Sequence, residues 1–326
     1  MRPAMNGLIA GFDAGQTHTT CRLVAAQSGA LLAEGQGPGV CHLAAPGGSS
    51  RFVAALQSSL NAARSQMAVE HANAPLLAAA VGASGIEQGT AVQQQGLELA
   101  ASSLTLPTSR VTVTGDERTA LRGAFPDQAG IVVISGTGTI AVGRSADGRE
   151  HRCGGWGWLL DGAGSAMDIG RDALALSLQM ADRRRVETPL RQELWQALGM
   201  DPVDPQAPQR IKALVVNPDF GPAGFAALAP VVEQRAGGGD GEAEAILQAN
   251  AAALVAMVVA IADALALEAP AVSPMGGALQ HLPRFLQYFA TDLATALPKS
   301  QLRAPEGDAC AGAICLARAL AASATT

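Results

Sequence analysis

A strand-and-turn pattern that occurs twice is the feature of this sequence that most constrains its fold. Residues 7–15, GLIAGFDAG, read as a buried strand ending in glycine, and the segments 19–27 and 29–37 follow as two further strands. Residues 130–151, GIVVISGTGTIAVGRSADGREH, repeat this order of strand, glycine turn, strand, Asp-Gly turn and strand. Each first turn combines glycine with threonine. The repetition predicts two α/β lobes built on one plan.

The remaining segments fit the same division. In the first lobe, 48–70 and 88–103 have helical spacing, and 76–85 and 109–116 read as strands. The second lobe is expected to hold a short strand at 270–279 and helices at 163–183, 188–199, 205–216, 220–236, 242–268 and 283–297. We therefore expect an N-terminal lobe over 1–115 and a C-terminal lobe with extra helices over 116–307.

Composition argues against several classes of function. Hydrophobic residues make up 48% of the chain and charged residues 15%, which suits a folded core and is too apolar for disorder. The net charge of −6 argues against nucleic acid or an anionic membrane as partner, because both need a basic face. No secretory signal is visible, and Asp263 interrupts the apolar run 250–267, which favours a buried helix over a membrane span. We expect a cytoplasmic protein.

Cysteine and histidine spacing gives no support to a metal site. The five cysteines are odd in number, widely spaced and without a CxxC pair, so zinc ribbons and paired redox thiols are disfavoured. The five histidines show no metal-ligand spacing either. Buried, reduced thiols are the expected state of the cysteines.

The two glycine turns are candidates for binding phosphate. In GFDAGQTHTT, Asp13 ends a strand, Gly15 lets backbone N–H groups converge, and the hydroxyls of Thr17 and Thr19 add possible donors. A single carboxylate suits Mg²⁺, which keeps several of its waters. SGTGT, 135–139, repeats this chemistry. Either turn alone could be an ordinary hairpin, but the pair favours a clamp on the phosphates of a nucleotide.

Three further strand ends each allow two interpretations. Asp116 follows a buried strand and is either the N-cap of a helix or a general base that takes a proton from an attacking hydroxyl. GASG, 82–85, is either a turn of small residues or a close approach of backbone to a ligand. Gly276 and Gly277 form either a helix cap or a flat surface for an adenine ring.

The segment CGGWGWLLDGAGSA, 153–166, places two of the three tryptophans among five glycines with one carboxylate, Asp161. Its composition suits a ligand platform or a tight turn over a core. Trp158 in particular is as consistent with a core position as with a binding site.

Taken in order, these segments resemble the actin, sugar-kinase and heat-shock ATPase superfamily, and within it the N-acetylglucosamine kinase and benzoyl-CoA-reductase-type ATPase family. The resemblance runs across nearly the whole chain, and its most specific parts are GFDAGQTHTT, ISGTGT and CGGWGWLLDGAGSA. It implies an actin-like ATPase fold of α/β class, with two ribonuclease-H-like lobes around a nucleotide cleft. It also implies that the last helix, within 308–326, packs back on the first lobe.

The resemblance implies a role for each candidate residue. Asp116 is placed as the catalytic base, and Asp13 as the residue near Mg²⁺, acting through water. The positions implied for ATP are Asp13, Gly15, Gln16, Thr17, Gly136, Thr137, Gly138, Gly276, Gly277 and Ala278. The positions implied for the sugar are His42, Ser84, Gly85, Gly155, Trp156 and Asp161.

Two positions depart from the family pattern. Amino-sugar kinases of this group usually read Gly-Asp-Glu-Gly-Ser where this chain has residues 161–165, Asp-Gly-Ala-Gly-Ser, so the carboxylate stands one place early and the glutamate is absent. Eukaryotic members have an Asn–His pair where this chain has Cys41 before His42, and a thiol is a weak donor. Both departures concern the sugar rather than ATP.

The sequence thus predicts an ATP-dependent kinase that phosphorylates an amino sugar such as N-acetylglucosamine or glucosamine, with the 6-hydroxyl as the expected acceptor. One alternative is an ATPase activator of an electron-transfer dehydratase or reductase, with Cys153 beside Gly154 as a candidate ligand of an iron–sulfur cluster. Another is a non-catalytic sugar-binding sensor. Related kinases are often dimers, so a homodimer is one option for the oligomeric state.

Overall fold

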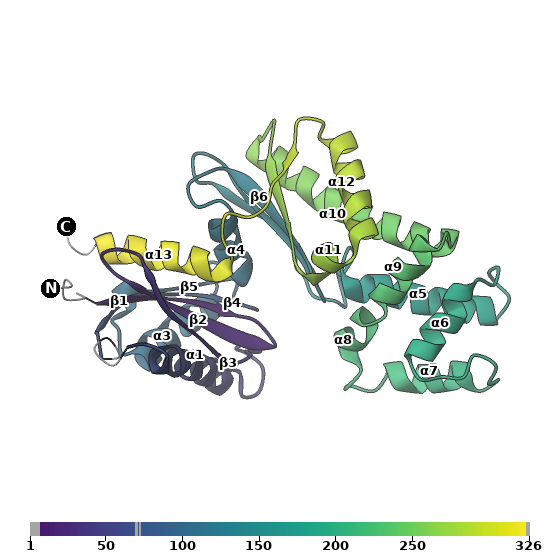
Figure 1. Cartoon of the computed structure of the whole chain (residues 1–326), viewed down its shortest axis with the longest axis horizontal. Coiled ribbons are helices and arrows are strands. Elements are labelled where there is room, and N and C mark those ends of the chain that lie inside the picture. Colours follow the sequence, from purple (N-terminus) through teal and green to yellow (C-terminus); the bar gives the residue numbers. More distant parts are fainter. Residues whose placement is uncertain (1–6, 69–70, 72, 324–326) are drawn as a thin grey trace. The chain divides into compact units, whose positions relative to one another are not determined.

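The structure is a computed structural model that describes residues 7–68, 71 and 73–323 (Figure 1). The chain forms two compact units. Unit 1 contains the described residues up to Gln128 and those from Pro305 onward, and unit 2 is Ala129–Ala304. The division falls later than the expected boundary at residue 115, because the helix that starts at Asp116 packs on α13 and β4 of unit 1.

Unit 1 is built on a five-stranded sheet with the order β3-β2-β1-β4-β5. β2 is antiparallel to its neighbours β1 and β3, and β1, β4 and β5 are parallel. The strands are β1 (Leu8–Ala14), β2 (His18–Ala25), β3 (Leu31–Pro38), β4 (Leu76–Ala83) and β5 (Val111–Thr114). The helices are α1 (Gly48–Ser65), α3 (Ala91–Leu104), η1 (Thr108–Arg110), α4 (Asp116–Ala124) and α13 (Ala309–Ser323).

Side chains alternate along each strand and so project from both faces of this sheet. Both faces are buried under helices. Phe12 on β1 packs in the cluster that holds Phe52 and Leu56 of α1. Ile9, which projects from the other side of β1, packs with Ile314 of α13. Figure 1 shows α13 across one face of the sheet and α1 and α3 on the other. A Cβ at Gly11 would lie only 2.8 Å from the backbone of α13, so the absent side chain permits this close packing.

Unit 2 repeats the sheet in the order β10-β9-β6-β7-β8, with β6 antiparallel to β7 and parallel to β9. Its strands are β6 (Gly130–Ser135), β7 (Thr139–Arg144), β8 (Glu150–Gly154), β9 (Ala271–Met275) and β10 (Gln301–Leu302). Its helices are α5 (Ala166–Ala181), α6 (Pro189–Ala197), α7 (Ala207–Val215), α8 (Gly221–Ala226), α9 (Ala229–Gly237), α10 (Gly241–Leu265), α11 (Gly277–His281) and α12 (Pro283–Ala296). The matching strand orders confirm the predicted α/β class with two lobes of one plan.

One helix expected from the sequence is two in the structure. The segment 220–236 divides into α8 and α9, because Pro230 lies in the first turn of α9. Proline lacks the N–H that a continuous helix needs there, whereas a helix start leaves that N–H without a partner in any case.

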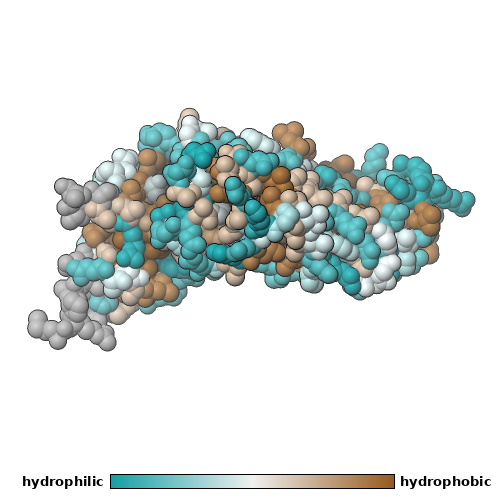
Figure 2. Space-filling model, turned by 90° about the horizontal axis from the view of Figure 1, so that it is seen from above, coloured by the Kyte–Doolittle hydropathy of each residue, from teal (hydrophilic) through white to brown (hydrophobic). Residues whose placement is uncertain are grey.

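α10 is long and apolar enough to cross a membrane by length and composition alone. Its buried side chains, among them Leu247, Leu254 and Ile261, pack into the hydrophobic core of unit 2. The predicted buried helix therefore accounts for its hydrophobicity. On the face displayed in Figure 2, hydrophobic and hydrophilic residues are interspersed in small patches.

Candidate active site

In unit 1, the predicted polar residues gather at one edge of the sheet. The parallel strands β1, β4 and β5 end at this edge, where Asp13 is the second-last residue of β1 and Ser84 and Asp116 come just after β4 and β5. The N–H of Ser84 donates to the carbonyl of Ala14 at 3.0 Å, which joins the two turns directly. The topology thus brings the candidate magnesium, sugar and base positions of unit 1 together.

The turn after β1 is held from two sides. The Gly15 N–H donates to the His18 carbonyl at 3.0 Å, and the Gly15 carbonyl accepts from Val40 at 2.9 Å. Gln16 and Thr17 are exposed at its tip. Thr19, expected to add a hydroxyl, is instead fully buried, because side chains on β2 alternate and Thr19 faces the same side as Cys21 and Leu23.

His42 lies against the turn that follows β4. Its ring carbon Cδ2 is 3.2 Å from the position a Cβ on Gly85 would occupy, and its Nδ1 accepts from the Ala44 N–H at 3.2 Å. The His42 side chain is exposed. The structure therefore brings His42 and Gly85, two of the sugar positions implied by the resemblance, into contact.

Asp116 is the first residue of α4, and the N-cap, one of the two roles that the sequence allowed for Asp116, is Gly115. Burial raises the pKa of the Asp116 carboxyl to about 6, and the charge of Glu117 also raises it. Hydrogen bonds from backbone N–H groups of the first turn lower this pKa in part. A carboxylate with a pKa near 6 is a better proton acceptor than an ordinary aspartate at neutral pH.

The pKa of Asp13 is raised in the same way. Burial raises the pKa of Asp13 to about 6, and the negative charges of Asp116 and Asp308 contribute, whereas His18 and Arg22 act in the opposite direction. Its carboxylate has no hydrogen-bond partner among the described residues. Two adjacent carboxylates of this kind attract a cation.

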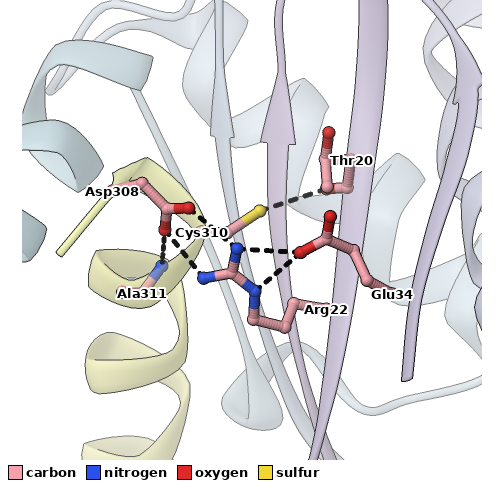
Figure 3. A network of polar contacts seen from close by, with 6 residues as sticks. All are labelled: Thr20, Arg22, Glu34, Asp308, Cys310 and Ala311. Carbon is pink, nitrogen blue, oxygen red and sulfur yellow. Dashed lines mark hydrogen bonds and ion pairs between the residues drawn. The ribbon is translucent and has the colours of Figure 1, made fainter. Parts of the chain in front are cut away.

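Asp308 and Arg22 were not singled out in the sequence, and they lie next to Asp13. Arg22 on β2 donates two hydrogen bonds to Asp308, both of 2.8 Å, and two to Glu34 on β3, of 2.9 and 2.8 Å (Figure 3). Asp308 also accepts from the N–H of Ala311 at 2.8 Å, so it caps α13. An N-cap could be read from Asp308 in the sequence, but its approach to β2 across 286 residues could not.

In unit 2, the second glycine turn lies beside the Gly276 segment. The Gly136 N–H donates to the Gly138 carbonyl at 2.9 Å, and a Cβ on either glycine would meet no atom within 4 Å. Gly276 has a φ of 89°, and a Cβ there would be 2.4 Å from the Ser135 carbonyl oxygen. The turn thus leaves open space above its backbone, and only glycine fits next to it at 276.

The local backbone conformation of CGGWGW requires its glycines. Gly154, Gly155 and Gly157 have φ values of 73°, 75° and 89°, which side-chain-bearing residues rarely adopt. This backbone leaves Trp156 59% exposed, with the Arg152 guanidinium carbon 4.8 Å from its ring centroid. Trp158 is 40% exposed and so is not a core residue. The buried tryptophan of this unit is Trp195.

Asp161 lies close to this tryptophan segment. Its N–H donates to the Gly157 carbonyl at 2.9 Å, and its Oδ2 is 3.6 Å from where a Cβ on Gly154 would lie. The carboxylate therefore stands next to the end of β8, one residue from Gly155. A second carboxylate, Asp168, is buried below the same loop and pairs with Arg171 at 2.6 Å.

The residues present fit a nucleotide and a hydrated magnesium ion. The open backbone of the Gly136–Gly138 turn is suited to phosphate oxygens. No group of three His, Cys, Asp or Glu side chains in the described part of the chain is arranged to hold a metal. A single unbonded carboxylate, Asp13, matches an ion that is held largely by water and phosphate.

Comparison with known proteins decides the family. Residues 10–317 match the BadF/BadG/BcrA/BcrD ATPase family. The chain belongs to this ATPase family. The resemblance inferred from the sequence is thereby confirmed.

Several relatives of this family member are named as sugar kinases. It is 29% identical over 211 residues to the N-acetylmuramic acid/N-acetylglucosamine kinase of Clostridium acetobutylicum, covering 64% of this chain and 67% of that one. It is 41% identical over 71 residues, 22% of each chain, to the N-acetyl-D-glucosamine kinase of Dictyostelium discoideum.

Solved structures give the same grouping. A protein of Chromobacterium violaceum described provisionally as an N-acetylglucosamine kinase has a TM-score of 0.75 and 28% identity, covering 97% of this chain and 100% of that one. A ROK hexokinase of Thermus thermophilus, at 15% identity, has a TM-score of 0.60, with 98% and 100% of the two chains covered. The second likeness shows a shared fold.

Proposed function

We propose that this protein is an ATP-dependent kinase that phosphorylates a hydroxyl of an amino sugar such as N-acetylglucosamine or glucosamine, with the 6-hydroxyl as the expected acceptor. The observation that carries the proposal is the pair of carboxylates Asp13 and Asp116, which the ends of β1 and β5 bring to one edge of the unit 1 sheet. Burial raises the pKa of each to about 6. The names of the relatives support the substrate class.

In this proposal the residues of unit 1 provide the acid–base chemistry. Asp116 would accept the proton of the sugar hydroxyl, because burial makes its charged form costly and its protonated form accessible. Asp13 would hold Mg²⁺ through water, and Gly15, Gln16 and Thr17 would lie along the phosphates. When bound, ATP supplies the phosphoryl group and Mg²⁺ balances the charge of its phosphates.

The residues of unit 2 would provide shape and backbone donors. Gly136, Thr137 and Gly138 would present N–H groups to phosphate oxygens. Gly276, Gly277 and Ala278 would lie beneath the adenine, where a larger residue at 276 would collide with Ser135.

Each unit holds candidate positions for the sugar. In unit 2, the exposed ring of Trp156 and the backbone of Gly155 are suited to the sugar's apolar face and hydroxyls, and Asp161 is placed to accept a hydroxyl hydrogen bond. In unit 1, Ser84, Gly85 and His42 form a contiguous group. We further propose a cytoplasmic enzyme that forms a homodimer and acts on neither nucleic acid nor membrane.

An ATP-consumption panel tests the function. Purified protein is incubated with ATP and Mg²⁺ and with glucosamine, N-acetylglucosamine, N-acetylmuramic acid, N-acetylmannosamine, glucose or no sugar, and ADP release is measured. We expect ADP release to depend on an amino sugar, with a sugar phosphate detectable by mass spectrometry. ADP release that is the same without sugar would instead favour the ATPase activator, and binding of sugar without ADP release would favour the sensor.

A further inference from the structure

Unit 2 contains a groove between α5, α7 and α8, of about 520 Å³. Residues from Arg171 to Asp182 line it along α5, a stretch of about 16 Å at 1.5 Å per residue. None of the residues assigned to ATP or sugar above lines this groove. It is therefore a separate feature, of the size that small-molecule sites usually have.

The floor of the groove is apolar. Leu174 and Leu178 of α5 face Ile211 and Val215 of α7, at the helical spacings that put residues on one side of each helix. These side chains continue into the hydrophobic core of unit 2. An elongated apolar chain lying in the groove would therefore gain burial along its length.

The charges around the groove are unequal in how far they are neutralised. Arg171 is paired with Asp168 at 2.6 Å and with Asp172 at 3.2 Å, and Arg184 with Asp182 at 2.7 Å. Lys212, exposed in the last turn of α7, makes no ion pair within the described part of the chain. One uncompensated cation at the edge of an apolar groove selects a ligand with one negative charge.

We propose that this groove binds an anionic amphiphile, a medium-chain carboxylate whose alkyl chain lies on Leu174, Leu178, Ile211 and Val215 and whose carboxylate pairs with Lys212. The alkyl chain fits a floor made of aliphatic side chains from two helices. A single carboxylate matches the single uncompensated ammonium, whereas a phosphate monoester would carry additional charge without a partner. The proposal stands independently of the kinase activity, because the groove uses none of its residues.

The chain offers a clean chemical probe of this site, because Lys212 and Lys299 are its only two lysines. Full-length protein is treated with a small amine-acylating reagent, and modification of each lysine is followed by mass spectrometry, with and without decanoate below its micelle concentration. We expect decanoate to slow acylation of Lys212 and leave that of the exposed Lys299 unchanged.

Calorimetric titration then distinguishes the contribution of the ligand's carboxylate from that of its alkyl chain. Affinity is expected to rise about fourfold for each methylene between hexanoate and decanoate, because each buried methylene contributes about 0.8 kcal/mol to transfer. Decanol, which lacks the charge, is expected to bind about fivefold more weakly than decanoate. Lys212→Gln should reduce decanoate affinity to that of decanol, whereas the matched control Lys299→Gln should leave it unchanged.

A second variant tests the floor without touching the core. Ala175 is exposed in the groove, so Ala175→Phe should fill the space and abolish decanoate binding while circular dichroism stays unchanged. The proposal is overturned if decanoate does not bind, if it protects both lysines equally, or if neither variant changes its affinity. Binding of an acidic amphipathic peptide at Lys212 in place of decanoate would overturn it too, in favour of a protein partner.

Discussion

The two sheets of this protein share a strand order but carry different chemistry at corresponding turns. The turn after β1 follows a partly buried acid, Asp13, whereas the turn after β6 follows Ile134 and Ser135. Ser135 uses its hydroxyl within unit 2, by donating to the Gly164 carbonyl. At these corresponding turns unit 1 therefore has a carboxylate, whereas unit 2 has open glycine backbone. A duplicated frame has been specialised by a few side chains.

The largest expected effect comes from removing the proposed base of unit 1, Asp116. Asp116→Asn should lower kcat by about 10³-fold, since a positioned general base contributes typically 10²–10⁴-fold, and should leave ATP affinity nearly unchanged. Coupled ADP-release kinetics and calorimetry with ATP measure the two quantities. Asp127→Asn, on an exposed acid of the same unit, is the matched control and should behave as wild type. A variant at 116 that keeps a tenth of wild-type turnover would remove Asp116 from the role of base.

The same substitution should stabilise unit 1. The pKa of Asp116 is raised from 3.8 to about 6, so its contribution to stability is greatest at low pH and is lost as the pH rises through 6. At pH 7.5, replacing the buried charge by an amide should raise the free energy of unfolding by about 1–2 kcal/mol. Urea denaturation at pH 7.5 checks the gain, which should shrink at pH 4.5. An unchanged or lowered stability at pH 7.5 would show that the carboxylate is better solvated than its surroundings indicate.

The pH dependence of activity should run in the opposite direction. A base must be deprotonated to act, so kcat should fall about tenfold per pH unit as the pH drops below about 6. Initial rates between pH 5 and 8, at saturating ATP and sugar, measure the profile. If kcat instead falls only near pH 4, Asp116 titrates as an ordinary aspartate during turnover.

Substitutions at two glycines of unit 2 should distinguish an effect on ATP binding from an effect on folding stability. Gly138→Ala meets no atom within 4 Å in the structure, so stability should be unchanged, but the added methyl should raise the KM for ATP about tenfold if phosphate lies there. Gly276→Ala, at a φ of 89° and 2.4 Å from the Ser135 oxygen, should lower the free energy of unfolding by about 2 kcal/mol. Thermal melting and ATP kinetics on both variants distinguish the outcomes. Wild-type KM in a stable Gly138→Ala protein would place the phosphates elsewhere.

The smallest expected effect concerns the exposed tryptophans. Trp156→Ala should raise the KM for the sugar about fivefold with little change in that for ATP, because one face of an aromatic ring is lost. Trp158→Ala serves as the comparison, since both side chains are exposed in the same turn. Equal effects of the two substitutions would assign the sugar contact to the loop as a whole rather than to Trp156.

Much of the fold was predictable from local patterns. Short apolar runs bounded by glycine turns predicted the strands of both sheets except β10, and the Gly-Thr turns marked where each first hairpin closes. The break between α8 and α9 was missed, although Pro230 is a local signal for it. The later boundary of unit 1 was missed because α4 is held there by packing against α13, which is distant in sequence.

The sequence by itself determined the pattern of two sheets, the family and the residue types at each turn, because these depend on short-range periodicity and on a few motifs. Only the tertiary structure decided that Arg22 and Asp308 stand beside Asp13, that Thr19 points into the core and that Trp158 does not. It also raised the pKa of Asp13 and Asp116 through burial, which no single residue encodes. Charge and exposure depend on neighbours brought from far along the chain, so folding had to assemble them.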